Sequence, residues 1–390
     1  MLQMAESMSR LGTESAFEVL ARAAKLEAQG KSIINLGIGQ PDFKTPDHIV
    51  EAAIKALRDG HHGYTPANGI LPLREAVAAD FEKRNGVAVN PDNVVVVPGG
   101  KVTMFFSILM FGGAGVDILY PDPGFPIYRS VIEYSGARAI PIPLREENEF
   151  SFSADELLSL ITPRTKMIIL NSPANPTGGV LDTGELDKLV AGLEAHPDIV
   201  ILSDEIYSQM LYDGRRHVSL MTYESIRDRV ILLDGWSKTY AMTGWRLGYA
   251  VWPTELAESA TRLAINCHSC VNAPTQFAGL AALTGPQDAV HDMVKAFDER
   301  RKIIVEELNN IPGFHCVNPG GAFYAFPNIG GTGLTARQAQ DGLLTETGVA
   351  TVAGTSFGEY GEGFLRFSYA NSVENIREAL QRIRVWLQAR

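Results

Sequence analysis

Cysteine is scarce in this 390-residue chain, and its few cysteines form no recognisable framework. Cys267, Cys270 and Cys316 are an odd number, which argues against a set of disulfides. Cys267 and Cys270 have the C-x-x-C spacing, but a zinc site would need a second ligand pair, and only Cys316 beside His315 is left. We therefore expect buried or chemically inert thiols and no metal site.

The chain also lacks long apolar runs. Glycine, proline or a charged residue interrupts every such run well before the ~20 residues that a transmembrane helix needs. The start, "MLQMAESMSRLGTESAF", lacks the apolar segment of a secretory signal peptide. We therefore expect a cytoplasmic protein that makes no membrane contact.

Basic residues are outnumbered, with 34 Lys and Arg against 45 Asp and Glu and a formal net charge of -11. The longest basic cluster is "RRK" at 300–302, too short for a surface that neutralises a row of phosphates. We therefore expect no nucleic-acid partner. Small molecules or a second copy of the chain are the expected partners.

Short apolar runs recur through the middle of the chain. They are rich in β-branched residues, are too short for helices, and alternate with helical patterns such as "TGELDKLVAGLEAH". The runs end at Val97, Tyr120, Leu170, Leu202 and Leu233. This alternation predicts an α/β fold with a mostly parallel sheet covered by helices on both faces.

The two ends of the chain predict a second, smaller α+β unit. Apolar residues spaced as on one helix face recur at 373, 376, 380, 383 and 387. Gly285 and Pro286 interrupt the pattern before another long helical stretch, and the sheet begins only near residue 90. We expect a large domain over 46–285, and a small domain with an N-terminal arm over 1–45 and 286–390.

Polar residues follow several apolar runs directly, at the edge where parallel α/β sheets bind ligands. "PGGK" follows Val97, "NSPANPTGG" follows Leu170, "SDEIY" follows Leu202, and "DGWSK" follows Leu233. Taken singly, each has an ordinary explanation as a loop, a helix cap or a turn. Their joint order predicts a cleft that holds an amide, a carboxylate and an amine.

In combination these residues resemble the class I/II aminotransferases, fold type I pyridoxal-phosphate enzymes, and in particular the bacterial aspartate aminotransferases. The motifs span nearly the whole chain: "LGIGQPDF" (36–43), "YTPANGILPLREAV" (64–77), "NPTGG" (175–179), "SDEIY" (203–207), "SKTYAMTGWRLGY" (237–249) and "LRFSYA" (365–370). The resemblance implies transfer of an amino group between an L-amino acid and a 2-oxo acid. A β-elimination or carbon–sulfur lyase on the same fold is the alternative.

The resemblance also implies roles for residues in the cleft. Lys238 would form an internal aldimine with pyridoxal phosphate, which explains why an amine follows the apolar run "VILLDGW". Burial and the nearby cation Arg246 would favour its neutral form. Asp204 would keep the pyridine nitrogen protonated, and Tyr207 would tune the ring oxygen, so Lys238, Asp204 and Tyr207 are the expected catalytic residues. The expected cofactor-binding set is Tyr64, Gly99, Gly100, Lys101, Phe125, Asn171, Asn175, Asp204, Tyr207, Ser237, Lys238 and Arg246.

The phosphate is expected where a helix follows Val97. The backbone N–H groups of the Gly99–Lys101 turn and the helix dipole would bind it, with the glycines allowing close approach. Arg246, an unpaired charge in an apolar stretch, matches a further phosphate ligand. Tyr64 matches a tyrosine that reaches the phosphate of the neighbouring subunit, which implies a homodimer with shared active sites.

The substrate's α-carboxylate is expected on Arg366, whose planar fork suits bidentate binding, with Asn175 and the backbone N–H of Gly39 beside it. Lys101 resembles a lysine that faces the distal carboxylate in some bacterial aspartate aminotransferases, whereas Phe17 and Ile38 make the opposite wall apolar. An acidic amino donor is favoured, aromatic and aliphatic donors are the alternatives, and 2-oxoglutarate is the expected acceptor.

Overall fold

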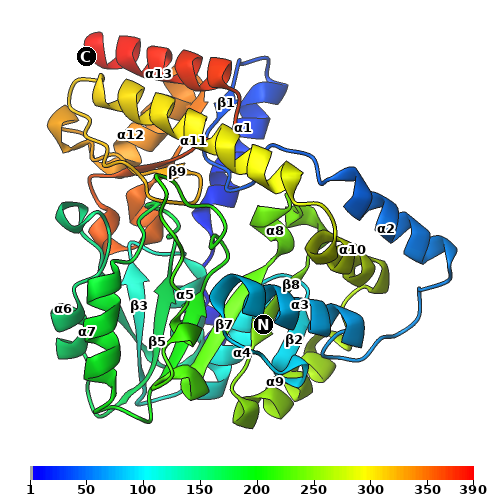
Figure 1. Ribbon diagram of the computed structural model, residues 1–390. Helices are drawn as coiled ribbons and strands as arrows, with labels where there is room; N and C mark the ends of the chain where they lie inside the picture. Colours follow the sequence, from blue (N-terminus) through cyan, green and yellow to red (C-terminus); the bar gives the residue numbers. More distant parts are fainter. Residues whose placement is uncertain (1–2) are drawn as a thin grey trace.

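A seven-stranded sheet lies at the centre of the computed structural model, which describes residues 3–390 (Figure 1). In spatial order its strands are β2 (Val94–Val97), β8 (Gly248–Val251), β7 (Val230–Gly235), β6 (Val200–Asp204), β5 (Thr165–Asn171), β3 (Asp117–Asp122) and β4 (Arg138–Pro143). β8 pairs antiparallel with β2 and β7, and every other pair in this sheet is parallel. The mostly parallel sheet is confirmed.

All five apolar runs that the sequence marks as strands lie in this sheet, but β4 and β8 were not predicted. β4 contains Pro141 and Pro143 and pairs only with β3. Proline is tolerated there because an edge strand has unpaired N–H positions. β8, "GYAV", is a four-residue strand inside a motif that shows no alternation.

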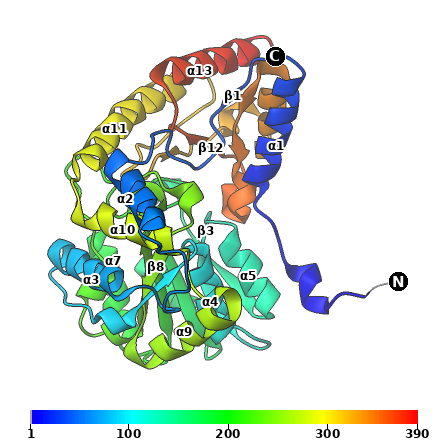
Figure 2. The ribbon, with the colours of Figure 1, turned by 90° about the vertical axis from the view of Figure 1, so that its right-hand side faces the viewer.

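Helices cover both faces of the sheet (Figure 2). One face carries α4 (Lys101–Phe111), α5 (Ile127–Ser135) and α9 (Thr254–His268). The other carries α2 (Asp47–Arg58), α3 (Leu71–Asn85), α6 (Ala154–Ser159), α7 (Thr183–Leu193) and α10 (Ala273–Thr284). Successive valines of β2 enter opposite cores, because side chains alternate along a strand. A strand buried on both faces therefore has an uninterrupted apolar sequence.

The two chain ends meet in a second core, where the blue and red segments adjoin in Figure 1. It contains a parallel pair, β1 (Ile34–Asn35) with β10 (Val349–Ala350), and a three-stranded antiparallel sheet of β11 (Val352–Ala353), β12 (Leu365–Ser368) and β9 (Tyr324–Ala325). The helices around it are α1 (Ser15–Ala28), α11 (Asp288–Asn309), α12 (Ala336–Gly342) and α13 (Val373–Gln388).

The expected face of α13 is buried at Ile376, Leu380 and Ile383. The division into a large domain over 46–285 and a small domain over 1–45 plus 286–390 stays a prediction. No helix within residues 3–390 is both long and apolar enough to cross a bilayer.

Candidate active site

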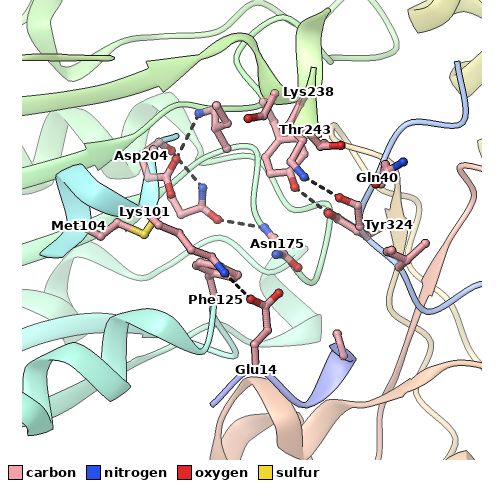
Figure 3. Close-up of a pocket in the computed structure, with 18 of the residues that line it drawn as sticks. Glu14, Gln40, Lys101, Met104, Phe125, Asn175, Asp204, Lys238, Thr243 and Tyr324 are labelled. Atoms are coloured by element: carbon pink, nitrogen blue, oxygen red, sulfur yellow. Dashed lines mark hydrogen bonds and ion pairs between the residues drawn. The ribbon is translucent and has the colours of Figure 1, made fainter. Parts of the chain in front are cut away.

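A cavity of about 450 Å³ lies at the carboxyl ends of β5, β6 and β7 and is closed on its other side by residues of β9 and β12 (Figure 3). It collects most of the residues that the sequence predicts for the site. Those lining it are Gly39, Gly100, Lys101, Phe125, Asn171, Asn175, Asp204, Tyr207, Ser237, Lys238, Arg246 and Arg366. Gly99 lies beneath Arg246, and Tyr64 is 93 % exposed and does not line this cavity.

Lys238 lies in α8 (Trp236–Thr239), a short helix directly after β7. Its half-buried Nζ donates a hydrogen bond to the carbonyl oxygen of Gly39 at 2.5 Å. Burial, together with the positive charge of Arg366, lowers the pKa of this amine to about 8. Arg246, the cation expected from the sequence, has a smaller effect than Arg366. A larger share of neutral amine at neutral pH makes Nζ a better nucleophile and base.

The same contact uses the carbonyl of Gly39, and donation by its backbone N–H to the substrate's α-carboxylate stays a prediction. The Gly39 backbone passes so close to the hydroxyl of Tyr324 that a Cβ would collide with that oxygen. Glycine is therefore required here by close packing.

Asp204 ends β6 and is only 2 % exposed. Its carboxylate accepts hydrogen bonds from the Tyr128 hydroxyl at 2.5 Å and from the Ile206 backbone N–H at 3.3 Å. Burial raises its pKa to about 6, because the charged form loses its hydration. No cation lies within ion-pair distance of it in the described chain, so the carboxylate suits a protonated ring nitrogen. Tyr128 was not predicted; its only sequence mark is an aromatic residue one helical turn after Phe125.

A pH dependence of stability follows from this burial. The pKa of Asp204 is raised from 3.8 to about 6, so its contribution to the free energy of unfolding is full below pH 3.8 and is lost as the pH rises through 6. Asp204→Asn is neutral at every pH. It is expected to stabilise the cofactor-free protein relative to wild type by up to about 3 kcal/mol at pH 7.5, and much less at pH 4.

Thermal unfolding of both cofactor-free proteins at several pH values measures this difference. The exposed Asp198 offers a matched control, because Asp198→Asn makes the same charge change outside the cavity. A stability difference for Asp204→Asn that does not vary with pH would contradict the raised pKa.

An anion site lies at the N-terminus of α4. The backbone N–H groups of Gly100 and Lys101 have no hydrogen-bond acceptor among residues 3–390, and both point from the start of an 11-residue helix. The Ser237 hydroxyl and the Arg246 guanidinium line the same end of the cavity. Free N–H groups at a helix start, together with an unpaired guanidinium, suit a phosphate.

One expectation for this anion site is wrong in detail. The N–H of Gly99 donates to the carbonyl of Val97 at 2.7 Å and is not free; the space above this glycine, which has φ +94°, is filled by the Arg246 guanidinium. Arg246 is exposed at the cavity, and its backbone lies in the left-handed region at φ +56°. Its only hydrogen bond in the described residues goes to the carbonyl of Thr243 at 2.7 Å.

Arg366, on β12, is 2 % exposed and lies between the rings of Tyr324 and Phe357, each 4.7 Å from the guanidinium carbon. It donates to the side-chain oxygen of Asn175 at 2.9 Å and to the carbonyl of Gly37 at 2.5 Å. No carboxylate within residues 3–390 pairs with it, and its Nε has no partner. A buried, unpaired guanidinium is costly, so the cavity is suited to an incoming carboxylate.

Hydrogen bonds hold the remaining predicted residues in place. Asn171 donates to the Asp204 carbonyl at 3.0 Å and accepts from the Asn175 N–H at 3.0 Å, so it fixes two cavity loops. The Tyr207 hydroxyl lies 2.7 Å from that of Tyr324, a residue of β9 that was not predicted. Phe125 faces the cavity and meets Tyr128 edge to face.

The three cysteines lie away from this cavity. Cys316 is buried, and burial raises its pKa to about 12, whereas Cys267 is exposed; the expected inertness of the thiols stays a prediction. In the part of the chain described here, no three His, Cys, Asp or Glu side chains are grouped as metal ligands.

Known proteins are similar to this chain in sequence and in overall fold. A sequence model of the family described as "Aminotransferase class I and II" matches residues 31–383. The aspartate aminotransferase of Pyrococcus horikoshii is 40% identical over 94% of this chain and 92% of its own length. Aromatic-amino-acid aminotransferase 2 of Thermococcus litoralis is 39% identical over 91% and 92%. The crystal structure of the aspartate aminotransferase from Rhizobium meliloti, 33% identical, matches with a TM-score of 0.95 over 100% of this chain and 99% of that one. The chain therefore belongs to the class I and II aminotransferases, enzymes that transfer amino groups with pyridoxal 5'-phosphate.

Proposed function

We propose that this aminotransferase exchanges the amino group of an L-amino acid with a 2-oxo acid in the cavity around Lys238, with the α-carboxylate held by Arg366. The observation that carries the proposal is the buried Arg366 guanidinium, which has no anionic partner in the described chain and shares the cavity with a lysine of lowered pKa. Its fork binds a carboxylate in two hydrogen bonds and so orients the α-carbon.

The cavity fits pyridoxal phosphate. Arg246, Ser237 and the free N–H groups of Gly100 and Lys101 would hold the phosphate, because together they offer charge and hydrogen-bond donors to a dianion. Asp204 would accept a hydrogen bond from the protonated ring nitrogen, and such a contact would favour its charged carboxylate over the raised pKa that burial gives it. When bound, the cofactor supplies an electron sink for the bond that breaks at the α-carbon.

The other side of the ring is bounded by hydrogen-bonding and aromatic groups. Tyr207 and Asn175 line the cavity and would meet the ring oxygen, and Phe125 would pack on the ring face. Asn171 orients Asn175 from behind. Each of these groups is held by a second contact, which keeps the site in one geometry before the substrate arrives.

Lys238 moves the proton during the reaction. With its pKa lowered to about 8, Nζ would take the proton from the substrate's α-carbon and pass it to the cofactor. Arg366 keeps the substrate in reach, while the buried hydroxyls of Tyr207 and Tyr324 pair with each other.

The active unit in this proposal is a homodimer in the cytoplasm. Tyr64 is 93 % exposed and lies outside its own cavity, so it is available to the phosphate of a partner subunit. The described residues before α1 lie beside α5 at the edge of the molecule (Figure 2), where the Arg10 Nε donates to the Glu133 carbonyl at 3.0 Å and the Gly12 N–H to the Ser130 hydroxyl at 2.9 Å. The three free thiols suit a reducing compartment. Sedimentation that finds an active monomer would contradict the shared site.

A half-reaction distinguishes transamination from the lyase alternative. The cofactor-loaded enzyme is mixed with an amino acid in the absence of any 2-oxo acid. We expect one equivalent of 2-oxo acid per active site and no ammonia, because the amino group stays on the enzyme. Continuous release of pyruvate and ammonia from a β-substituted amino acid would instead support a lyase, which the comparisons do not favour.

A further inference from the structure

An ion pair lies inside the cavity on the side where the substrate's side chain must fit. The Nζ of Lys101 is 2.6 Å from a carboxylate oxygen of Glu14, as the dashed line between them in Figure 3 shows. Lys101 begins α4, and Glu14 directly precedes α1, so the two come from distant parts of the chain. The Glu14 side chain is 17% exposed and that of Lys101 41%.

The charges that line the cavity can be divided by role under the proposed function. Arg246 would bind the phosphate, Asp204 would bind the ring nitrogen, and Arg366 would bind the α-carboxylate. Lys238 would act as the nucleophile and the base. The remaining charged residues among those lining the cavity are Glu14 and Lys101. Because they pair with each other, the compartment left for the substrate's side chain has no net charge.

Apolar groups make up the walls around this ion pair. Ala16, Phe17, Ile38 and Phe125 line the cavity. The Lys101 Nζ lies 5.6 Å from the ring centroid of Phe17 and 5.2 Å from that of Phe125. A distal carboxylate that approached Lys101 would therefore meet the Glu14 carboxylate beside it, among groups that screen charge poorly. An aromatic or aliphatic side chain would meet ring faces and methyl groups instead.

We infer that Glu14 sets the substrate class: it withholds Lys101 from dicarboxylic substrates, so that donors with an apolar side chain are preferred over aspartate and glutamate. This inference rests on the proposed function. The sequence alone favours a distal carboxylate on Lys101, whereas in the structure Lys101 is already paired with Glu14. The same preference applies to the 2-oxo acid acceptor, which occupies the same compartment.

The test compares the cofactor-loaded wild type with Glu14→Gln in the half-reaction, so that no acceptor confuses the result. The amide keeps the shape and an acceptor for Lys101 but removes the negative charge. We expect the wild type to prefer phenylalanine to aspartate, and the variant to raise kcat/KM for aspartate by about tenfold or more with less than about threefold change for phenylalanine. Glu18→Gln is the matched control, since Glu18 is an exposed residue of α1 that does not line the cavity.

A second measurement needs only the wild type. It is expected to bind 3-phenylpropionate at least about tenfold more tightly than succinate, measured as competitive inhibition. A wild type that prefers aspartate and succinate, or a Glu14→Gln variant with an unchanged ratio, would overturn the role of Glu14. If no amino acid at all yields 2-oxo acid, the proposed function fails and not the inference alone.

Discussion

Replacing Lys238 by alanine is expected to lower kcat for transamination by about 10⁴-fold or more and to abolish covalent attachment of pyridoxal phosphate. The amine is placed by α8 and oriented by the Gly39 carbonyl, with its pKa lowered to about 8 by burial. Lys101, the other lysine that lines the cavity, is paired with Glu14 and cannot take over the task. Steady-state kinetics and peptide mass after borohydride reduction measure the two effects.

Two further variants make this result specific. Lys238→Arg keeps a cation but offers no nucleophilic amine, and we expect it to be as inactive as the alanine variant. Lys44→Ala removes an exposed lysine outside the cavity and should keep full activity. Turnover in Lys238→Ala close to that of wild type would refute the role assigned to the amine.

Replacing Arg366 by leucine is expected to raise KM for every α-amino acid and to cost about 2 to 5 kcal/mol in kcat/KM. The reason is that the buried guanidinium is the group suited to the α-carboxylate, and the Asn175 oxygen and the Gly37 carbonyl lose their donor as well. Kinetics with several donors check whether the loss is shared by all of them. An unchanged KM would place the α-carboxylate elsewhere.

The pH dependence of pyridoxal phosphate capture tests whether Arg366 acts on Lys238 through its charge or only supports the structure of this variant's cavity. The positive charge of Arg366 helps to lower the pKa of Lys238, so its removal should raise that pKa above about 8. The rate at which the cofactor-free variant captures pyridoxal phosphate should then rise only at higher pH than in wild type. Arg366→Lys, which restores a charge without the fork, is expected to recover the pH profile more fully than the KM.

The sequence predicted the central sheet well because strands buried on both faces are continuous apolar runs, as in β2 and β6. β4 was missed because its prolines interrupt the apolar run, and β8 was missed because it has only four residues. Residues that directly follow a strand, such as Asp204, were found together with the motif around them.

Three of the side chains that enter the cavity from other elements and were not predicted show why. Tyr128 comes from a helix face, Tyr324 from a two-residue strand, and Glu14 from the start of a helix, where an acidic residue is ordinary. Gly99 was selected for close approach to a phosphate, whereas the group that approaches it is Arg246. Such contacts join distant parts of the chain, and local patterns do not report them.

The pairing of Ile34 with Val349 has a consequence during synthesis of the protein. The strands of the central sheet lie between residues 94 and 251, so they can assemble while the chain is still growing, whereas β1 must wait until β10 has left the ribosome. Arg366 arrives later still, on β12. A nascent chain that stops before that strand therefore holds the groups that capture the cofactor but has no anchor for an amino acid, and catalytic competence begins only when translation is nearly complete.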